Sequence, residues 1–385
     1  MQTVFIAGGS TGLGKELALA LARRGSHVTI FARRQQQLDQ TRDEVLSARK
    51  SESQEITTQS LDLTDPSKIQ SAFAAQHRLP DILYCVAGGT TNELGFLVDL
   101  EPADVQRCMT NNYLTSAYPA QAMLKLWIED DKSSKPVTRQ KNSSRRRQLI
   151  FVSSAAALVA FPGYVAYTPA KCAVRALADT LRCELKRYSG PMTKYSVHIS
   201  FPSNFISPSF MDEIKNKPEL TKQLEGTTAP MSELMQKLHS SKQVANYIIK
   251  KVDKGEFVIC SEYEAKLLFA GMAGPSPKRG IAIKIDAISG GAKVQANCLN
   301  TGIFKKSNIS YRLQVDVANQ TLVCENITEF MPTKNVQPNQ FQDVYGDTYI
   351  SGFLESGVFN AIVSIELANK DEVKDFGGEL LLDQN

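Results

Sequence analysis

The feature that most restricts the fold of this chain is a glycine-rich turn close to the amino terminus. Residues 3–7 are an apolar run of strand length, and they lead directly into GGSTGLG at residues 8–14. A stretch rich in alanine and leucine begins at Leu17 and has the composition of a helix. The sequence therefore predicts a strand, a tight turn and a helix in immediate succession, as in the first unit of an α/β fold.

The spacing of the glycines in this turn suits a dinucleotide. Gly8 would permit the tight turn, Gly12 would let the backbone approach a pyrophosphate, and Gly14 would allow the helix to pack closely on the strand. The phosphates would rest on the amino terminus of the helix, where backbone N–H groups point outward. A turn that binds nothing is the alternative, but its place directly after the first strand favours a nucleotide. The predicted contacts are Gly8, Ser10, Gly12, Leu13 and Gly14.

Strand-like and helix-like stretches alternate through the first two thirds of the chain. The strand-like runs after the first lie at residues 27–31, 56–60, 82–86, 149–152, 196–201 and 257–260. This alternation predicts a doubly wound parallel sheet of the Rossmann type. From Ile281 onward apolar and polar residues alternate singly, which predicts antiparallel strands. We therefore expect a nucleotide-binding domain at residues 1–280 and an appended strand-rich segment at residues 281–385.

Two arginines follow the second strand-like run. An enzyme that uses NAD usually places a carboxylate about 20 residues beyond the glycine turn, where it binds the ribose hydroxyls. This chain has Arg33 and Arg34 there instead. A guanidinium suits a 2′-phosphate, because its planar fork donates two parallel hydrogen bonds to phosphate oxygens. Together with Ser10, the arginines predict NADPH as the cofactor; the alternative is that they only open a solvated helix.

A tyrosine and a lysine four residues apart, Tyr167 and Lys171, are predicted to share one face of a helix. Pro169 lacks an N–H and fits only in a first turn, so the helix should begin close to it. A phenol loses its proton near pH 10, and a neighbouring ammonium would lower that pKa enough for acid–base chemistry. Ser154, which follows the run at residues 149–152, could hydrogen-bond the carbonyl oxygen that Tyr167 protonates. A chance pairing is the alternative, but the serine and the glycine turn together favour a site for hydride addition to a carbonyl.

The chain resembles the short-chain dehydrogenase/reductase family in these motifs. The resemblance lies in GGSTGLGKELA at residues 8–18, in FVSSAAA and YTPAKCAVRALAD around Ser154 and Tyr167, and in FPSNFIS and KPELTKQLEGTTAPMSE within residues 201–233. Within the family, the chain is most similar to the fungal 3-ketodihydrosphingosine reductases. The resemblance covers about residues 1–280.

The resemblance implies further contacts with the cofactor. Asp62 and Leu63 match the positions that contact the adenine, and Gly88 lies in the glycine pair after the fourth strand. Pro202 and Ser207 match the segment that closes over the nicotinamide. Tyr167 and Lys171 would also contact the nicotinamide ribose, and the NADPH that Arg33 and Arg34 predict would be the cofactor in this site.

The resemblance also implies a fourth catalytic residue. Asn112 matches the asparagine that holds a water for the proton relay, and the neighbouring Asn111 fits less well. Val86 departs from the family, which usually has an asparagine there that braces the backbone. The implied catalytic set is Asn112, Ser154, Tyr167 and Lys171.

The implied reaction is the reduction of 3-ketodihydrosphingosine to dihydrosphingosine in sphingolipid biosynthesis, at the cytosolic face of the endoplasmic reticulum. The expected partners are a long-chain lipid ketone, a membrane surface and a second copy of the chain. Two alternatives stay open: a reductase of another lipid or steroid ketone, and a non-catalytic fusion in which a vestigial reductase carries a strand-rich binding segment. The intact serine, tyrosine and lysine argue against a vestige.

Composition argues against two other classes of function. The formal net charge is only +4 over 385 residues, which argues against a dedicated nucleic-acid binder. The seven cysteines form no C-x-x-C pair and the four histidines are dispersed, so we expect no metal site. No charged and apolar leader precedes the first strand, and no window approaches the about 18 apolar residues of a membrane span, so we expect a soluble protein. Family members usually carry a hydrophobic anchor after a stretch like residues 275–280, and none follows here.

Three further segments carry weaker predictions. Residues 130–147 are polar, basic and rich in serine, which predicts a surface loop that either is solvated or presents an arginine patch, residues 145–147, to anionic lipid. Residues 344–365 are faintly similar to a segment of perforin-like domains. An apolar stripe with helical spacing predicts either core packing or a pliable lid over an alkyl chain. Its members are Met231, Leu234, Met235 and Leu238.

Overall fold

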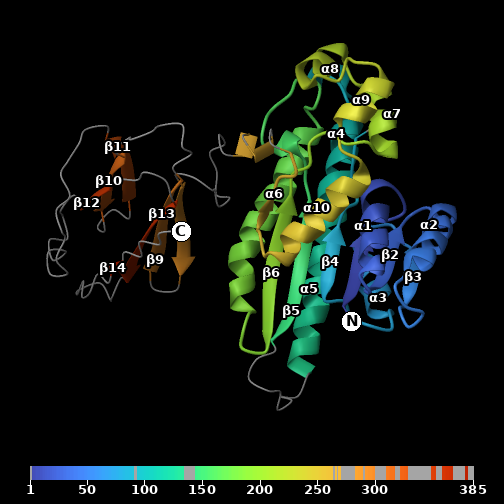
Figure 1. The fold of residues 1–385 in the computed structure, drawn as a ribbon, viewed down its shortest axis with the longest axis horizontal. Coiled ribbons are helices and arrows are strands. Elements are labelled where there is room, and N and C mark those ends of the chain that lie inside the picture. The colour runs from blue at the N-terminus through green and yellow to red at the C-terminus, as the bar shows by residue number, and fades with distance from the viewer. Residues whose placement is uncertain are drawn as a thin grey trace. The chain divides into compact units, whose positions relative to one another are not determined.

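The computed structural model describes residues 2–90, 93–133, 144–262, 265–266 and 268–269, and beyond residue 281 only the backbone of strands. The first unit is built on a sheet of seven parallel strands in the order β3-β2-β1-β4-β5-β6-β7 (Figure 1). These strands are β1 (Thr3–Ala7), β2 (His27–Ala32), β3 (Ile56–Ser60), β4 (Ile82–Cys85), β5 (Arg145–Val152), β6 (Thr193–Ser200) and β7 (Val258–Ile259). The doubly wound fold predicted from the alternation of strands and helices is confirmed.

Helices connect the strands of this sheet. They are α1 (Gly12–Arg23), α2 (Gln35–Ala48), α3 (Pro66–Ala74), α4 (Pro102–Met109), α5 (Thr115–Ser133), α6 (Tyr167–Glu184), α7 (Pro208–Asn216), α8 (Glu219–Glu225), α9 (Met231–Lys237) and α10 (Ser241–Asp253). Shorter turns are η1 (Leu97–Asp99), the π-helical η2 (Thr110–Leu114), η3 (Ala155–Ala157) and η4 (Leu185–Arg187). Among the helices that the structure describes, none combines the length and apolar character that a bilayer crossing requires.

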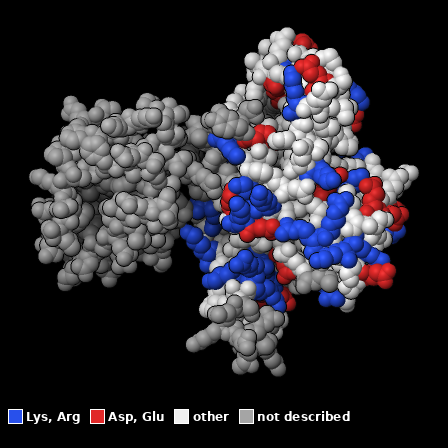
Figure 2. Space-filling view, in the orientation of Figure 1, with Lys and Arg blue, Asp and Glu red and all other residues white. Residues whose placement is uncertain are grey.

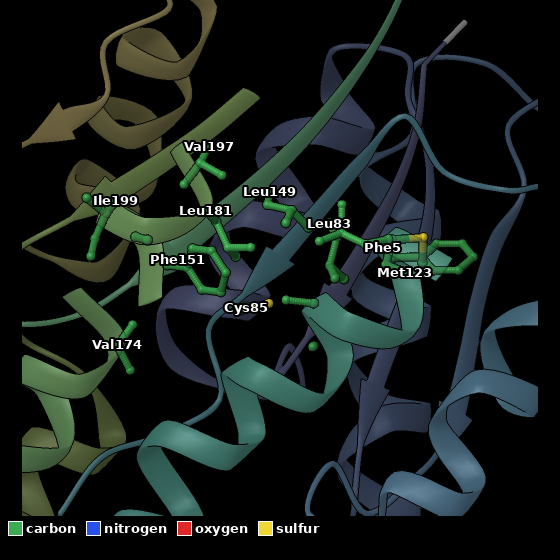
Figure 3. Packing of buried hydrophobic residues seen from close by; sticks show 14 of the residues in the cluster. Phe5, Leu83, Cys85, Met123, Leu149, Phe151, Val174, Leu181, Val197 and Ile199 are labelled. Atoms are coloured by element: carbon green, nitrogen blue, oxygen red, sulfur yellow. The ribbon is translucent and has the colours of Figure 1, made fainter. Parts of the chain in front are cut away.

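Successive side chains of β1 point into two apolar layers. Phe5 belongs to a buried cluster with Phe73 from α3 and Trp127 from α5. The next residue, Ile6, belongs to a second cluster that includes Ile248 from α10. Helices α3, α5 and α6 therefore cover one face of the sheet, shown in Figure 3, and α1, α2 and α10 cover the other. Each fully buried side chain of this size contributes about 1.5–3 kcal/mol, so the two layers hold the carboxyl ends of the strands in fixed positions.

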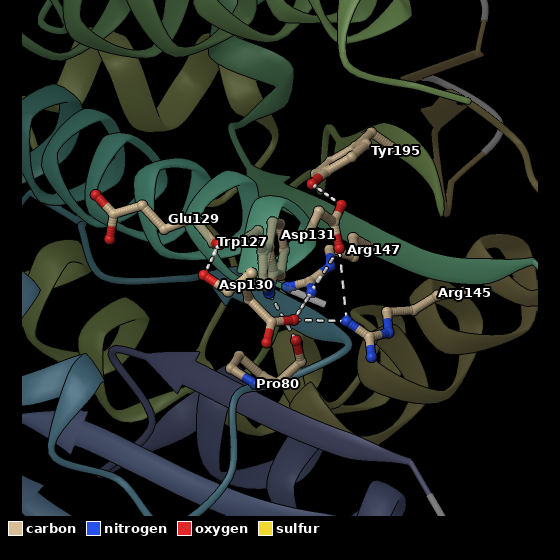
Figure 4. Close-up of polar contacts among 9 residues, drawn as sticks. Pro80, Trp127, Glu129, Asp130, Asp131, Arg145, Arg147 and Tyr195 are labelled. Atoms are coloured by element: carbon tan, nitrogen blue, oxygen red, sulfur yellow. Dashed lines mark hydrogen bonds and ion pairs between the residues drawn. The ribbon is translucent and has the colours of Figure 1, made fainter. Parts of the chain in front are cut away.

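The loop predicted at residues 130–147 is wrong at both of its ends. Asp130 and Asp131 belong to α5, and Arg145 and Arg147 begin β5. Arg147 is only 2% exposed and forms ion pairs with both aspartates, and Nη1 of Arg145 lies 2.5 Å from Oδ2 of Asp130 (Figure 4). Arg147 is therefore buried and cannot face a lipid surface, whereas Arg145 is 35% exposed and Arg146 is exposed, so contact of these two residues with anionic lipid stays a prediction. Residues 134–143 lie outside the described residues.

Aromatic side chains enclose these ion pairs. The Arg147 guanidinium carbon lies 5.7 Å from the centre of the Trp127 ring, and Trp127 Nε1 donates to the Pro80 carbonyl oxygen at 2.7 Å. The Tyr195 hydroxyl donates to Asp131 at 2.5 Å (Figure 4). This cluster joins α5, β5 and β6 at the end of the sheet opposite the glycine turn. Elsewhere, Figure 2 shows Lys and Arg interspersed with Asp and Glu on the face in view, as expected for a formal net charge of +4.

Two predictions about helices have different outcomes. Helix α6 begins at Tyr167 with Pro169 in its first turn, as expected from the missing N–H of proline. Of the four apolar residues predicted to form one stripe, only Leu234 of α9 is buried, while Met235 is 56% exposed. The four residues therefore do not form one buried stripe, and Leu238, which follows the end of α9 at Lys237, lines the cleft described below.

The second unit spans Pro277–Asn385. Its strands are β8 (Ala282–Ile288), β9 (Gly291–Leu299), β10 (Ile309–Asp316), β11 (Thr321–Ile327), β12 (Thr348–Gly352), β13 (Val358–Glu366) and β14 (Gly378–Glu379). They pair in the orders β11-β10-β12 and β14-β13-β9-β8. The independence of this segment from the reductase unit stays a prediction. The proposed perforin-like stretch includes residues 344–347 and 353–357, which lie outside the described residues.

Candidate functional site

A cleft of about 1240 Å³ lies at the carboxyl ends of the parallel strands. The strand order reverses between β1 and β4, and ligands of open parallel sheets bind beside such a switch point. All residues predicted to contact a cofactor line the cleft: Gly8, Ser10, Gly12, Leu13, Gly14, Arg33, Arg34, Asp62, Leu63, Gly88, Tyr167, Lys171, Pro202 and Ser207. Ser154 also lines it, so residues from distant parts of the sequence meet in this cleft.

The glycine turn leaves the amino terminus of α1 open to this cleft. The helix follows Thr11, whose side chain makes no capping hydrogen bond to the first turn. A Cβ atom at Gly14 would lie 2.1 Å from the carbonyl oxygen of Gly8, so no larger residue fits between the turn and the helix. Backbone N–H groups of a first helical turn attract phosphate. The turn therefore has the shape and the donors that a pyrophosphate needs.

Arg33 and Arg34 lie exposed after β2, at the edge of the cleft. Oδ1 of Asp62 accepts hydrogen bonds from the backbone N–H and the hydroxyl of Thr64, at 2.9 and 2.8 Å. The backbone hydrogen bond is the largest cause that lowers the pKa of Asp62, and the positive charge of Arg33 lowers it further. Two guanidiniums and one carboxylate therefore share the part of the cleft beyond the glycine turn.

Ser154, Tyr167 and Lys171 meet at the centre of the cleft. Ser154 follows β5 and donates a side-chain hydrogen bond to the Tyr167 oxygen. Its own oxygen accepts from the Ala156 N–H at 3.1 Å, which fixes the serine at the start of η3. Lys171 Nζ lies 5.6 Å from the centre of the Tyr167 ring and donates to the Val152 carbonyl oxygen at 3.3 Å. The arrangement offers a carbonyl oxygen two hydroxyl donors with an ammonium behind them.

Burial changes the proton affinity of both groups on α6. It raises the pKa of Tyr167, the Glu213 carboxylate raises it further, and the hydrogen bond from Ser154 lowers it. Burial also lowers the pKa of Lys171 to about 8. The pKa of Tyr167 is therefore raised overall in the protein without a cofactor, and a lowering of that pKa by Lys171 stays a prediction.

Asn112 lies in the π-helical turn η2 and is completely buried. Its Nδ2 donates to the carbonyl oxygens of Gly89 and Cys108, both at 2.9 Å, and its Oδ1 accepts from the Gly89 N–H at 2.8 Å. A Cβ atom at Gly88 would lie 2.7 Å from Asn112 Oδ1 and 3.1 Å from Lys171 Nζ. The asparagine side chain thus braces the backbone after β4, while Asn111 lines the cleft. Its role in holding a relay water stays a prediction.

A buried ionic cluster in the same cleft was not predicted. Its members are Tyr164 from the loop before α6, Glu213 of α7, Lys217 directly after α7, and Glu225 of α8. Lys217 Nζ lies 3.0 Å from Glu213 Oε1 and 2.5 Å from Glu225 Oε2, and the Tyr164 hydroxyl donates to Glu213 at 2.7 Å. Lys217 and Glu225 lie within the KPELTKQLEG stretch at residues 217–226, but their sequence spacing gives no sign of the contact with Glu213 or Tyr164.

Other charged groups of the cleft have local partners. Glu93 Oε1 accepts from Arg107 Nε at 2.9 Å. Glu262 accepts from the Ser203 N–H at 3.2 Å, and the His239 ring lies 3.2 Å from its other oxygen. Within the part of the chain that the structure describes, no group of three histidine, cysteine, aspartate or glutamate residues is arranged to hold a metal ion.

Residues 2–197 match the short chain dehydrogenase family. The chain is 34% identical over 300 residues to the 3-ketodihydrosphingosine reductase ksrA of Aspergillus fumigatus, an alignment that covers 73% of this chain and 77% of that protein. It is 29% identical over 280 residues to the 3-dehydrosphinganine reductase of Danio rerio, with 72% of this chain and 76% of that protein covered.

Solved structures resemble the first unit in fold. A short-chain dehydrogenase from Sphingobium yanoikuyae in complex with NADPH gives a TM-score of 0.54 at 18% identity, over 68% of this chain and 89% of that chain. A short-chain dehydrogenase/reductase from Burkholderia phymatum in complex with NAD gives 0.53 at 18% identity, over 69% and 90% of the two chains. At this identity the likeness concerns the fold.

Proposed function

Because this chain belongs to the short-chain dehydrogenase family, we propose that it is an NADPH-dependent reductase that converts 3-ketodihydrosphingosine to dihydrosphingosine. The observation that carries the proposal is the meeting of Ser154, Tyr167 and Lys171 in one cleft with the glycine turn. The names of the relatives from fungi and fish support the substrate.

The residues that would hold the cofactor follow from the lining of the cleft. The glycine turn and the open amino terminus of α1 would bind the pyrophosphate, and Arg33 with Arg34 would bind a 2′-phosphate. Asp62 would face the adenine, and Pro202 with Ser207 would cover the nicotinamide. When bound, NADPH supplies the hydride that reduces the ketone.

The chain's own groups handle the oxygen and its proton. Ser154 donates a hydrogen bond to the ketone oxygen and holds it against the Tyr167 hydroxyl. Tyr167 then donates its proton as negative charge develops on that oxygen. Lys171 stabilises the resulting phenolate by its charge and positions the cofactor ribose, and Asn112 keeps the loop after β4 in place against Lys171.

We place this activity at the cytosolic face of the endoplasmic reticulum, on the strength of the resemblance to sphingolipid-synthesising reductases. A substrate with a long alkyl chain needs an apolar entry to the cleft. Three apolar side chains line the cleft: Phe161 from the loop before α6, Phe210 of α7 and Leu224 of α8. These side chains support a lipid ketone over a small polar one.

The test is an NADPH oxidation assay on the full chain in detergent, with a panel of ketones. The panel contains 3-ketodihydrosphingosine, a simple long-chain ketone and a steroid ketone, each offered with NADPH and with NADH. We expect the highest kcat/KM for 3-ketodihydrosphingosine with NADPH. Faster reduction of the steroid would replace the proposed substrate, and no reduction of any ketone would favour the vestigial alternative.

A further inference from the structure

The cleft contains a pair of carboxylates that share one ammonium. The side chain of Lys217 is completely buried, and those of Glu213 and Glu225 are only 16% and 8% exposed. Among the described residues, the Lys217 ammonium is the one cation that lies within 4 Å of a carboxylate oxygen of Glu213 or Glu225. It also lies 5.4 Å from the centre of the Tyr164 ring and 5.6 Å from that of Phe210. The cluster is therefore one positive charge short when both glutamates are ionised.

Other acidic groups of the cleft are also short of cations, but they lie against different groups. Glu93 shares the Arg107 guanidinium with Asp104, and Glu262 has a backbone N–H and an imidazole beside it. Burying a carboxylate without a matching cation is costly, and a ligand cation can supply the missing charge. Burial raises the pKa of Glu213, which the Lys217 ammonium lowers only in part, so a further cation beside Glu213 would favour its ionised form.

This cluster lies beside the group that would protonate the substrate. The Tyr164 and Tyr167 rings are 5.6 Å apart between centroids, and the Tyr164 hydroxyl donates to Glu213. The charge of Glu213 reaches the Tyr167 hydroxyl, where it is the largest cause after burial that raises the pKa. Helices α7 and α8, which carry the two glutamates, lie together at one end of the first unit (Figure 1).

We propose that Glu213, supported by Glu225, binds the ammonium group of a 2-amino-3-ketone and so selects this substrate class over simple ketones. The inference rests on the proposed function, because the ketone of 3-ketodihydrosphingosine lies on the carbon next to the one that bears the amine. When Ser154 and Tyr167 hold the ketone oxygen, the ammonium lies on the neighbouring carbon. Glu213 lines the same cleft and lies close enough to Tyr167 for its charge to raise the pKa of that hydroxyl.

The bound ammonium would also assist the proton transfer. It would balance the negative charge that Glu213 exerts on Tyr167, and so make it easier for Tyr167 to lose its proton. A ketone without the amine would leave that charge unbalanced. Glu213 is therefore a residue that positions and selects the substrate, and Tyr167 remains the proton donor.

The decisive variant is Glu213→Gln in the full chain, which keeps the shape of the side chain and removes its charge. Two substrates are compared: 3-ketodihydrosphingosine and the hydroxyketone of the same chain length that lacks the amine. We expect kcat/KM for the aminoketone to fall about 10- to 100-fold, mainly through KM, because hydrogen bonds to charged groups contribute this much. The ratio of kcat/KM between the two substrates should fall by about the same factor. The matched control is Glu219→Gln, an exposed residue of α8 paired with Lys222 outside the cleft, which should leave the ratio unchanged.

A second measurement needs no variant and decides the matter if Glu213→Gln does not fold. Octadecylamine and octadecanol have the same chain and differ only in the head group. We expect the amine to inhibit the wild-type protein at least about 10-fold more strongly than the alcohol.

The outcomes separate the two proposals. Equal inhibition by amine and alcohol, or an equal loss of activity toward both ketones in a folded Glu213→Gln protein, would overturn the role of Glu213 while the proposed function stands. A wild-type protein that reduces the simple hydroxyketone but not the aminoketone, or that reduces neither, would overturn both.

Discussion

Lys171→Met is expected to raise the free energy of unfolding of the cofactor-free protein at pH 7 while abolishing reduction. Lys171 is only 3% exposed, and burial lowers its pKa from 10.5 to about 8. At 1.36 kcal/mol per pH unit, keeping this ammonium charged in the folded state costs about 3 kcal/mol. Methionine has a similar length and no charge, so the variant avoids that cost.

One lost contact reduces the gain. Lys171 Nζ donates to the Val152 carbonyl oxygen at 3.3 Å, and leaving that acceptor without its donor costs about 1 kcal/mol. The expected net stabilisation is therefore about 2 kcal/mol, which corresponds to a rise in Tm of roughly 4–8 °C. Urea unfolding followed by circular dichroism would measure it. Lys250→Met on the exposed side of α10 is the matched control and should change the stability by less than about 0.5 kcal/mol.

The pH dependence gives a second, independent readout. Below pH 8 Lys171 is protonated in both the folded and the unfolded protein, and the full cost is present. As the pH rises from about 8 toward 10.5, the folded protein releases this proton before the unfolded chain does, so the wild-type protein gains stability that the variant cannot gain. The advantage of Lys171→Met should therefore shrink between pH 7 and pH 9.5. A variant that is less stable than the wild type at pH 7, or an advantage that does not change with pH, would refute the reasoning.

Three further predictions concern the roles of single groups and of the carboxyl-terminal segment. Tyr167→Phe removes the proton donor and no phosphate contact, so kcat should fall about 10²–10⁴-fold while NADPH binding, followed by fluorescence, stays nearly intact; wild-type turnover would end the assignment of Tyr167 as the acid. Arg33→Asp should lower the binding affinity for NADPH much more than that for NADH, because the new carboxylate repels only the 2′-phosphate. Equal affinity of the unaltered protein for the two cofactors would show that Arg33 does not bind that phosphate. A chain ending at Gly280 should keep reductase activity within a few-fold in detergent, because β1 to β7 complete the parallel sheet before that residue; loss of soluble folding on truncation would place residues 281–385 in the core.

Several parts of this site could be predicted from the local sequence, because they depend on residues that lie close together in the chain. The glycine turn is contiguous, so its place between β1 and α1 and its approach to the helix could be predicted from residues 8–14 alone. Tyr167 and Lys171 are one helical turn apart, and the missing N–H of Pro169 sets the start of α6. The order of alternating strands and helices likewise predicted the parallel sheet, and strands of such a sheet bring their carboxyl ends, and Ser154 with them, to one edge.

Two results depended on contacts between distant segments. The basic run before β5 looked like a solvated loop, because nothing in its composition shows that Asp130 and Asp131 on α5 would bury Arg147. The direction of the pKa of Tyr167 could not be predicted either. Burial raises this pKa and so does the charge of Glu213, which comes from a later helix, and neither cause can be seen in the sequence around Tyr167.

The sequence by itself determined the glycine turn, the position of Tyr167 and Lys171 on one helix and the class of fold, since each depends on neighbours within a few residues or on a repeated alternation. Only the tertiary structure decided which carboxylates face Tyr167. Glu213 and Glu225 reach Lys217 from two different helices, and Tyr164 joins them from the loop before α6. The burial and the charge balance of this cluster depend on how the two helices and the loop pack together, and no pattern within a short stretch of sequence predicts that packing.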